Sequence, residues 1–151
     1  MDTIVLLDAD AVRGAMSGGI VGNALHYHVL LPSTMDEARR LALGGAPEGT
    51  VVVAEEQTRG RGRFSRVWVS PPGLNLTLSV LLRPEVGQLP YVNMAAALAV
   101  CDAAADLAGL PASIKWPNDV RIDGRKLAGI LVETEMAGQE VAHAVVGIGM
   151  N

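Results

Sequence analysis

Hydrophobic residues recur along this chain at two different spacings, which predict strands and helices in turn. From Leu74 to Leu82 every second residue is Leu or Val, and polar residues stand at positions 75, 77 and 79. This period-two pattern predicts a strand with one apolar face and one polar face. Shorter apolar runs predict further strands over residues 25–31, 51–54, 112–116, 120–123, 127–134 and 141–150.

A helix is predicted to begin at Ser33 or Thr34, because either side chain can cap a first helical turn. Glu37 stands three residues after Thr34, which is the spacing of a capping box. The helix is expected to end at Gly44-Gly45, since glycine is favoured just after a helix C-terminus.

The longest predicted helix covers residues 88–110 and is rich in alanine. Its expected buried side carries residues that recur at helical spacing, namely Met94, Leu98, Cys101 and Ala105. A weaker helical pattern covers residues 8–16 and ends at Ser17-Gly18-Gly19.

Turns between the last predicted strands indicate how the elements are connected. Asp123-Gly124 is typical of a tight hairpin, and Ala137-Gly138 predicts a second turn before the last strand. Hairpins therefore mix with helical crossovers, which predicts an α+β fold with a mixed β-sheet flanked by helices. At 151 residues one domain is expected, with residues 1–24 as a lead-in.

Composition narrows the class of protein. Half of the residues are hydrophobic and 3% are aromatic, so the core is aliphatic. A net charge of −4 and a pI near 5.3 argue against a general nucleic-acid binder. The single cysteine excludes an internal disulfide and fits a reducing cytoplasm. The apolar run from Met94 to Cys101 is too short to span a bilayer, so no membrane is expected.

Basic residues are concentrated in one glycine-containing segment. Four of the twelve Lys and Arg residues stand there, at Arg59, Arg61, Arg63 and Arg66. Glycine lets the backbone approach a ligand, and arginine binds phosphate or carboxylate in a fork. The segment lacks the spacing of a Walker loop. An anion site, a solvated basic loop and an RNA-binding patch all remain open on composition alone.

Lysine occurs at two positions, and each stands in a distinctive segment. Lys115 begins the sequence Lys-Trp-Pro-Asn-Asp, where a proline-fixed turn follows the end of a strand. Lys126 precedes Gly129, which indicates either a close backbone approach or a bulge inside a strand. Ser33-Thr34 either caps its helix or also contacts a ligand there. The three histidines show no zinc-ligand spacing, and no metal ligand is assigned.

Taken in order, these segments resemble the catalytic domain of the biotin–protein ligases, from about residue 25 to the end. The resemblance implies a fold related to class II aminoacyl-tRNA synthetases, the biotin–lipoate ligase fold. It implies an enzyme that uses ATP, with Mg²⁺, to activate biotin as biotinyl-AMP. The biotin then passes to a lysine of a biotin carboxyl carrier protein or domain. A lipoate or octanoate ligase and a non-catalytic biotin-binding fragment are the alternatives.

The resemblance also assigns roles to residues. Three residues match positions near the ureido end of biotin, which are Ser33, Thr34 and Met35. Gln57 matches a glutamine that hydrogen-bonds biotin. The loop expected to close over biotin and the adenylate phosphate contains Gly60, Arg61, Gly62 and Arg63. Lys115 and Arg63 are the expected catalytic cations. Trp68, Asn118 and Lys126 are expected on the nucleotide side, and Gly129 and Gly147 on the pocket floor.

Several positions depart from the family pattern. Arg59 stands where a small residue is usual, Ser65 where glycine is usual, and Met35 where asparagine is common. No winged helix precedes the ligase segments, which argues against the repressor branch and DNA binding, while a homodimer is permitted. The family continues past Asn151 into an adenosine-binding loop and a small barrel. We therefore expect a C-terminally truncated ligase domain with an incomplete ATP site.

Overall fold

A computed structural model describes residues 4–16 and 19–151. The helices are α1 (Ala9–Ala15), α2 (Thr34–Leu43) and α3 (Leu89–Ala108), with 3₁₀ turns at Arg63–Ser65 and Val86–Gln88. The strands are β1 (Ala24–Leu31), β2 (Thr50–Gln57), β3 (Leu76–Leu82), β4 (Ser113–Lys115), β5 (Asp119–Ile122), β6 (Arg125–Ala137) and β7 (Glu140–Met150). Each predicted element is present, with ends shifted by a few residues. The predicted end of the first helix at Ser17-Gly18-Gly19 falls partly outside the described residues.

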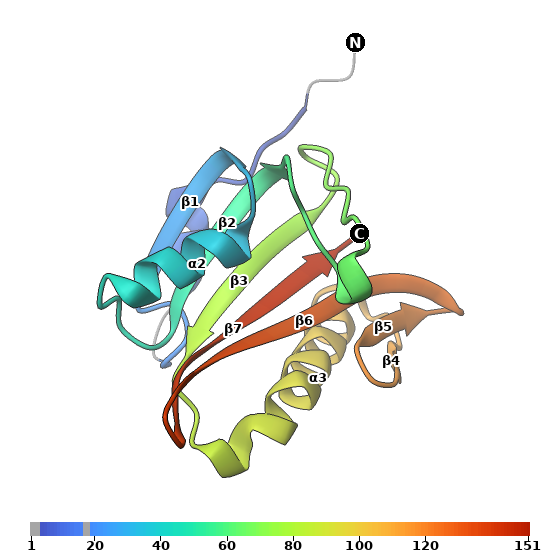
Figure 1. Cartoon of the computed structure of the whole chain (residues 1–151). Coiled ribbons are helices and arrows are strands. Elements are labelled where there is room, and N and C mark those ends of the chain that lie inside the picture. Colours follow the sequence, from blue (N-terminus) through green and yellow to red (C-terminus); the bar gives the residue numbers. More distant parts are fainter. Residues whose placement is uncertain (1–3, 17–18) are drawn as a thin grey trace.

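The strands form one seven-stranded sheet in the order β1-β2-β3-β7-β6-β5-β4 (Figure 1). β1 and β2 are parallel, and the other neighbouring pairs are antiparallel. Asp123 and Gly124 both have positive φ, as a tight hairpin between β5 and β6 requires. The α+β fold with a mixed sheet and flanking helices is therefore confirmed.

Two hydrophobic clusters lie on opposite faces of the sheet. On one face, α2 buries Met35 and Ala38 against Val52 and Leu81. On the other face, Val51 and its same-face neighbours pack toward α3. Because successive side chains of a strand point to opposite faces, burial on both faces explains the unbroken apolar run of β2. Figure 1 shows α2 at the β1–β3 end of the sheet and α3 beside β6.

The buried side of α3 differs from the predicted one. The helix buries residues at spacings of three to five, which are Val92, Ala97, Val100 and Ala104. Leu98 is half exposed and Ala105 is exposed, so the predicted buried side was wrong. Alanine residues occur on all sides of this helix, so the spacing of its apolar residues does not identify one buried face.

With its preceding 3₁₀ turn, α3 forms a 23-residue stretch that is long and apolar enough to cross a membrane by length and composition. In this structure the helix lies against the sheet, and Val92 and Val100 are buried in the core. Its apolar character is therefore used, at least in part, for packing within the domain.

The start of α2 also differs from the prediction. Ser33 occupies the N-cap position, but its side chain makes no capping hydrogen bond within the described residues. Glu37 pairs with Arg40, at 2.7 Å, instead of reaching back to the cap. The predicted capping box is therefore wrong, and the Ser33 hydroxyl is free to contact the arginine-rich loop.

Gly49, just before β2, tests how closely the chain before β1 approaches it. It has φ +82°, and a Cβ there would lie 1.7 Å from the Ile20 carbonyl oxygen. Gly45 has a similar φ of +84° with open space around it. Gly45→Ala is expected to lower the free energy of unfolding by about 1–2 kcal/mol, through the left-handed backbone alone. Gly49→Ala should lower it further in urea unfolding. Equal losses would contradict the close approach of residues 20 and 49.

Candidate active site

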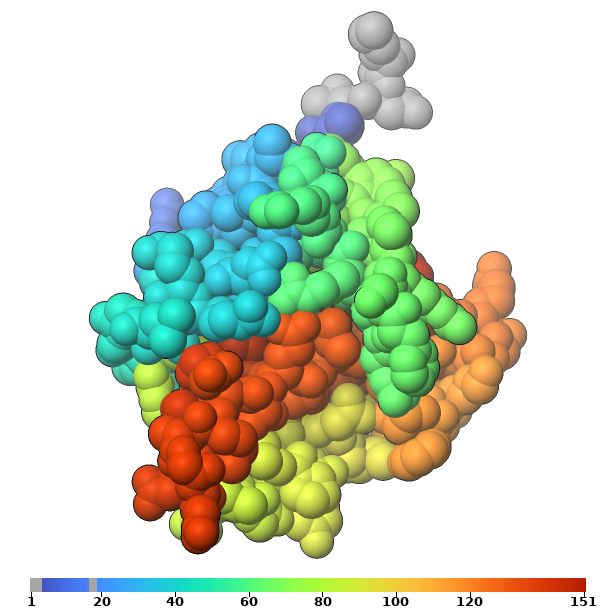
Figure 2. All heavy atoms as spheres, in the orientation of Figure 1, coloured from blue at the N-terminus to red at the C-terminus, as the bar shows by residue number. Residues whose placement is uncertain are grey.

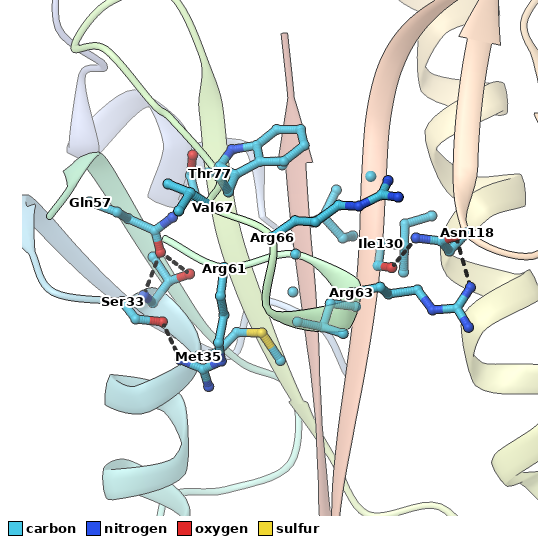
Figure 3. Close-up of a pocket in the computed structure, with 18 of the residues that line it drawn as sticks. Ser33, Met35, Gln57, Arg61, Arg63, Arg66, Val67, Thr77, Asn118 and Ile130 are labelled. Atoms are coloured by element: carbon cyan, nitrogen blue, oxygen red, sulfur yellow. Dashed lines mark hydrogen bonds between the residues drawn. The ribbon is translucent and has the colours of Figure 1, made fainter. Parts of the chain in front are cut away.

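A cavity of about 280 Å³ opens on the sheet face that carries α2 (Figure 3). Its walls come from segments far apart in the chain: the start of α2, the end of β2, the loop after β2, β3, and the turn before β5. β6 and β7 contribute small residues that form its floor. The sheet order brings these segments together, because β3 and β7 lie between β2 and β6.

Glycines make room in the floor for two large side chains. Gly129 of β6 pairs with Gly149 of β7. A Cβ at Gly149 would lie 2.3 Å from the Trp68 ring, and one at Gly147 would lie 2.7 Å from the Met35 sulfur. Trp68 and Met35 therefore lie directly on the strands. Gly129 reflects a close approach, since the irregularity of β5–β6 pairing falls at Val120/Arg121 instead.

One wall of the cavity is polar but uncharged. The backbone N–H of Thr34 donates to Gln57 Oε1 at 2.8 Å, and the Thr34 hydroxyl lies 2.8 Å from the Ser79 hydroxyl. Thr77 Oγ1 and Trp68 Nε1 are buried and have no hydrogen-bond partner in the described part of the chain. Buried polar atoms without partners are unfavourable, and both atoms are covered by neighbouring protein atoms.

Thr77 and Ser79 were predicted to lie on the polar face of their strand. Both are buried, and Thr77 lines the cavity. Alternation alone does not distinguish a solvent-facing polar row from one that faces a binding site. Leu74, expected on the apolar face, lies before β3 and is exposed.

Arg61 is held by carboxylates of the protein. Its Nε and Nη2 donate to Glu133 Oε1 and Oε2, both at 2.9 Å, and its Nη1 lies 3.0 Å from Asp36. Nη1 also donates to the Ser33 hydroxyl at 3.2 Å. The hydrogen bonds from Arg61 lower the pKa of Glu133 and raise that of Arg61. Arg61 therefore ties the loop after β2 to β6, across the cavity.

Arg63 points in a different direction from Arg61 (Figure 3). Its Nη1 donates to Asn118 Oδ1 at 3.1 Å. Asn118 is itself fixed to β6, because its Nδ2 donates to the Ile130 carbonyl and its own carbonyl accepts the Ile130 N–H. Among the described residues, no carboxylate lies within salt-bridge distance of Arg63, so its charge remains available to an anion.

The loop that carries Arg63 turns sharply. Phe64 and Ser65 both have φ of 57°, a left-handed conformation that glycine adopts more easily. Ser65 stands where the family pattern usually has glycine, and the backbone here adopts the conformation that a glycine would favour.

Lys126 lines the cavity next to Trp68. Its ammonium group is 2.9 Å from Asp119 Oδ1 and 5.4 Å from the centre of the Trp68 ring. The Trp68 ring, packed on the glycine floor, and the nearby cation are groups of the kind that suit a planar ligand.

The cavity brings together most of the predicted site residues. Those that line it are Ser33, Thr34, Met35, Gln57, Arg61, Gly62, Arg63, Trp68, Asn118, Lys126, Gly129 and Gly147. Among the described residues, Gly60 and Lys115 are not part of the lining. Gly60 is buried beneath the Trp68 carbonyl, and Lys115 ends β4 with an exposed side chain.

The sequence analysis assigned no site role to several charged residues, which include Arg66, Asp36 and Glu133. Arg66 lines the cavity, whereas Asp36 and Glu133 hold Arg61 from α2 and β6. An arginine-rich loop in an acidic chain indicates that some carboxylate pairs with it, but which one depends on the fold. Within residues 4–16 and 19–151, no group of three His, Cys, Asp or Glu side chains is arranged to hold a metal ion.

Comparisons of this sequence with known proteins agree on one protein family. The sequence profile of the biotin/lipoate A/B protein ligase family matches residues 27–151. The chain is 42% identical over 147 residues to the bifunctional ligase/repressor BirA of Bacillus subtilis, covering 96% of this chain and 45% of that protein. It is 45% identical over 123 residues to the biotin–[acetyl-CoA-carboxylase] ligase of Paracoccus denitrificans, covering 79% and 50%.

The fold is similar to a solved ligase structure. The biotin protein ligase from Aquifex aeolicus, in complex with biotin and ATP, superposes with a TM-score of 0.69 and 36% identity. The match covers 85% of this chain and 52% of that one. The chain therefore spans about half the length of the relatives it matches.

The ion pair between Glu133 and Arg61 is expected to hold the loop after β2 in place. Glu133→Gln keeps the shape of the side chain but removes its charge, so the loop should open more often. Trypsin should then cut after Arg63 or Arg66 at least about threefold faster, the ratio expected for ~0.7 kcal/mol. Glu135→Gln, two residues further along β6, is the matched control. Equal cleavage of both variants and the wild type would refute this anchoring.

Proposed function

Because this chain belongs to the biotin/lipoate A/B protein ligase family, we propose that it is the catalytic region of a cytoplasmic biotin–protein ligase. The proposed enzyme activates biotin with ATP as biotinyl-AMP and transfers the biotin to a lysine of a biotin carboxyl carrier protein or domain. The choice of biotin is supported by relatives named as biotin ligases and by a similar structure that holds biotin and ATP.

One observation carries this proposal. A single cavity has an uncharged polar wall around Gln57 on one side and the cation Arg63 on the other (Figure 3), and Lys126 also belongs to its lining. Biotin has an uncharged ureido group at one end and a carboxylate at the other. We assign the ureido group to Thr34 and Gln57, with the Met35 thioether beside the ring, and the carboxylate to the side of Arg63.

The first reaction joins two anions. A carboxylate oxygen of biotin attacks the α-phosphorus of ATP, the bond from that phosphorus to the bridging oxygen breaks, and pyrophosphate leaves with the electron pair. Cations near the reacting atoms reduce repulsion and stabilise the charged transition state. Besides Arg61, which is paired with carboxylates, the cations that line the cavity are Arg63, Arg66 and Lys126. The catalytic role of Lys115 stays a prediction, and no step is assigned here to the Mg²⁺ that accompanies ATP.

The second reaction forms the amide. The lysine amine attacks the carbonyl carbon of biotinyl-AMP, the carbon–oxygen bond to phosphate breaks, and AMP leaves. We assign the nucleotide to the part of the cavity lined by Trp68, Lys126 and Gly129. Residues 1–151 are proposed to act as one ligase domain, and a homodimer is compatible with this assignment.

Substrate choice tests the proposal directly. With biotin and ATP, the chain should release pyrophosphate in a biotin-dependent manner, measured with a coupled phosphate assay. Lipoate and octanoate should support release at least about tenfold more slowly, because Thr34 and Gln57 would then face no ureido partner. Equal release with lipoate or octanoate would contradict the biotin assignment. Biotin binding measured by calorimetry, without any turnover of ATP, would favour the non-catalytic alternative.

Arg63 is expected to retain the reactive intermediate. Arg63→Gly removes the cation and its bond to Asn118, so loaded biotinyl-adenylate should dissociate at least about tenfold faster, the ratio expected for ~1.4 kcal/mol. Released adenylate should then label lysines of a bystander protein, scored by streptavidin blot. Arg59→Gly, in the same loop but outside the cavity lining described above, is the control. If the Arg63→Gly variant releases biotinyl-adenylate no faster than the wild type, Arg63 does not hold the intermediate in the cavity.

A further inference from the structure

A second cavity, of about 290 Å³, adjoins the main one. Its walls are the first turns of α3, the turn from Trp116 to Asn118, and residues 130–132 of β6. The two cavities share Arg63, Asn118, Ile130 and Leu131 in their linings. Their common wall therefore contains the hydrogen bond between Arg63 and Asn118. Figure 2 shows the loop that carries Arg63, in green, standing out from the surface next to the segment around residues 110–130, in orange.

The chemistry of the second cavity differs from that of the main one. Among the described lining residues, Arg63 is the one charged side chain, and the others are apolar or uncharged, including Met94, Asn93 and Trp116. A triphosphate needs several cations, which this lining does not offer. An apolar stem with a small polar end fits this lining better.

We propose that the second cavity admits the lysine side chain that accepts biotin, an inference that rests on the function proposed above. Biotin and the nucleotide are assigned to the main cavity, so the acceptor amine needs a separate approach to the carbonyl carbon. The four methylene groups of a lysine match an apolar lining, and its nitrogen would arrive beside Arg63. Exposed Trp116, at the mouth, offers an apolar contact to the carrier domain.

The position of Arg63 also suits the reactive form of the amine. A nearby guanidinium disfavours the ammonium form of lysine and favours the neutral amine, which is the nucleophile. The nitrogen lone pair attacks the carbonyl carbon, AMP leaves with the electron pair of the broken carbon–oxygen bond, and the amine proton passes to water. Asn118 is fixed to the Ile130 backbone, so the passage opens by movement of Arg63.

The first experiment places an acceptor inside the cavity. The natural chain has two lysines, Lys115 and Lys126, which keeps the background of labelling simple. Met94→Lys puts an amine on the cavity wall, and Leu98→Lys puts one a turn further along α3, where the side chain is half exposed. Both variants are incubated with synthetic biotinyl-5′-adenylate, and biotin on each lysine is measured by peptide mass spectrometry.

The lysine introduced at position 94 should be biotinylated at least about tenfold faster than the one at position 98, the ratio that ~1.4 kcal/mol of barrier gives. Equal labelling of the two introduced lysines would overturn the proposal. Because biotinyl-adenylate is supplied, the result does not depend on the reaction with ATP.

A second experiment blocks the cavity. Met94→Trp should slow transfer to a purified biotin carboxyl carrier domain at least about tenfold, while biotinyl-adenylate affinity measured by calorimetry stays near that of the wild type. Leu98→Trp is the size-matched control. A Met94→Trp variant that binds the adenylate and transfers biotin at the wild-type rate would overturn the proposal. If the wild-type chain itself fails to bind biotinyl-adenylate, the proposed function fails and this inference falls with it.

Discussion

The bidentate pair between Arg61 and Glu133 is the interaction on which the rest of the site depends. It joins the loop after β2 to β6, with β3 and β7 lying between those strands. Both side chains are about 30% exposed, and Asp36 and Ser33 hold the same guanidinium. An isolated surface pair contributes about 0.2–1 kcal/mol, and a forked pair inside a network contributes more. The loop is therefore fixed over the cavity by contacts within the protein.

Because of this anchoring, Arg61 and Arg63 have different roles in the site. Because Arg61 is neutralised by carboxylates, it is poorly suited to bind a substrate anion, and its place in the site is to hold the loop. Arg63 is held by the neutral amide of Asn118, a weaker partner that a phosphate or carboxylate readily replaces. A loop that is fixed at Arg61 and free to move at Arg63 can release or retain a ligand without unfolding.

The sequence predicted the strands well because their apolar runs are packed on both faces of the sheet. It predicted the wrong side of α3, since alanine gives that helix little contrast between faces. Most of the predicted site residues meet in one cavity, although Ser33, Gln57, Asn118 and Gly147 are far apart in the chain. What the sequence did not reveal depends on strand register. Glu133 faces Arg61, and Thr77 faces the cavity, only because of how β3, β7 and β6 are paired.

The cavity also bears on the stability of the domain. Thr77 Oγ1 and Trp68 Nε1 are buried without partners in the described part of the chain, and the glycine floor forgoes side-chain packing beneath Trp68 and Met35. Each unpartnered atom is unfavourable by about 1–3 kcal/mol in a stable core. The glycine floor gives up stabilising contacts so that Trp68 and Met35 can lie against the strands while a cavity remains beside them.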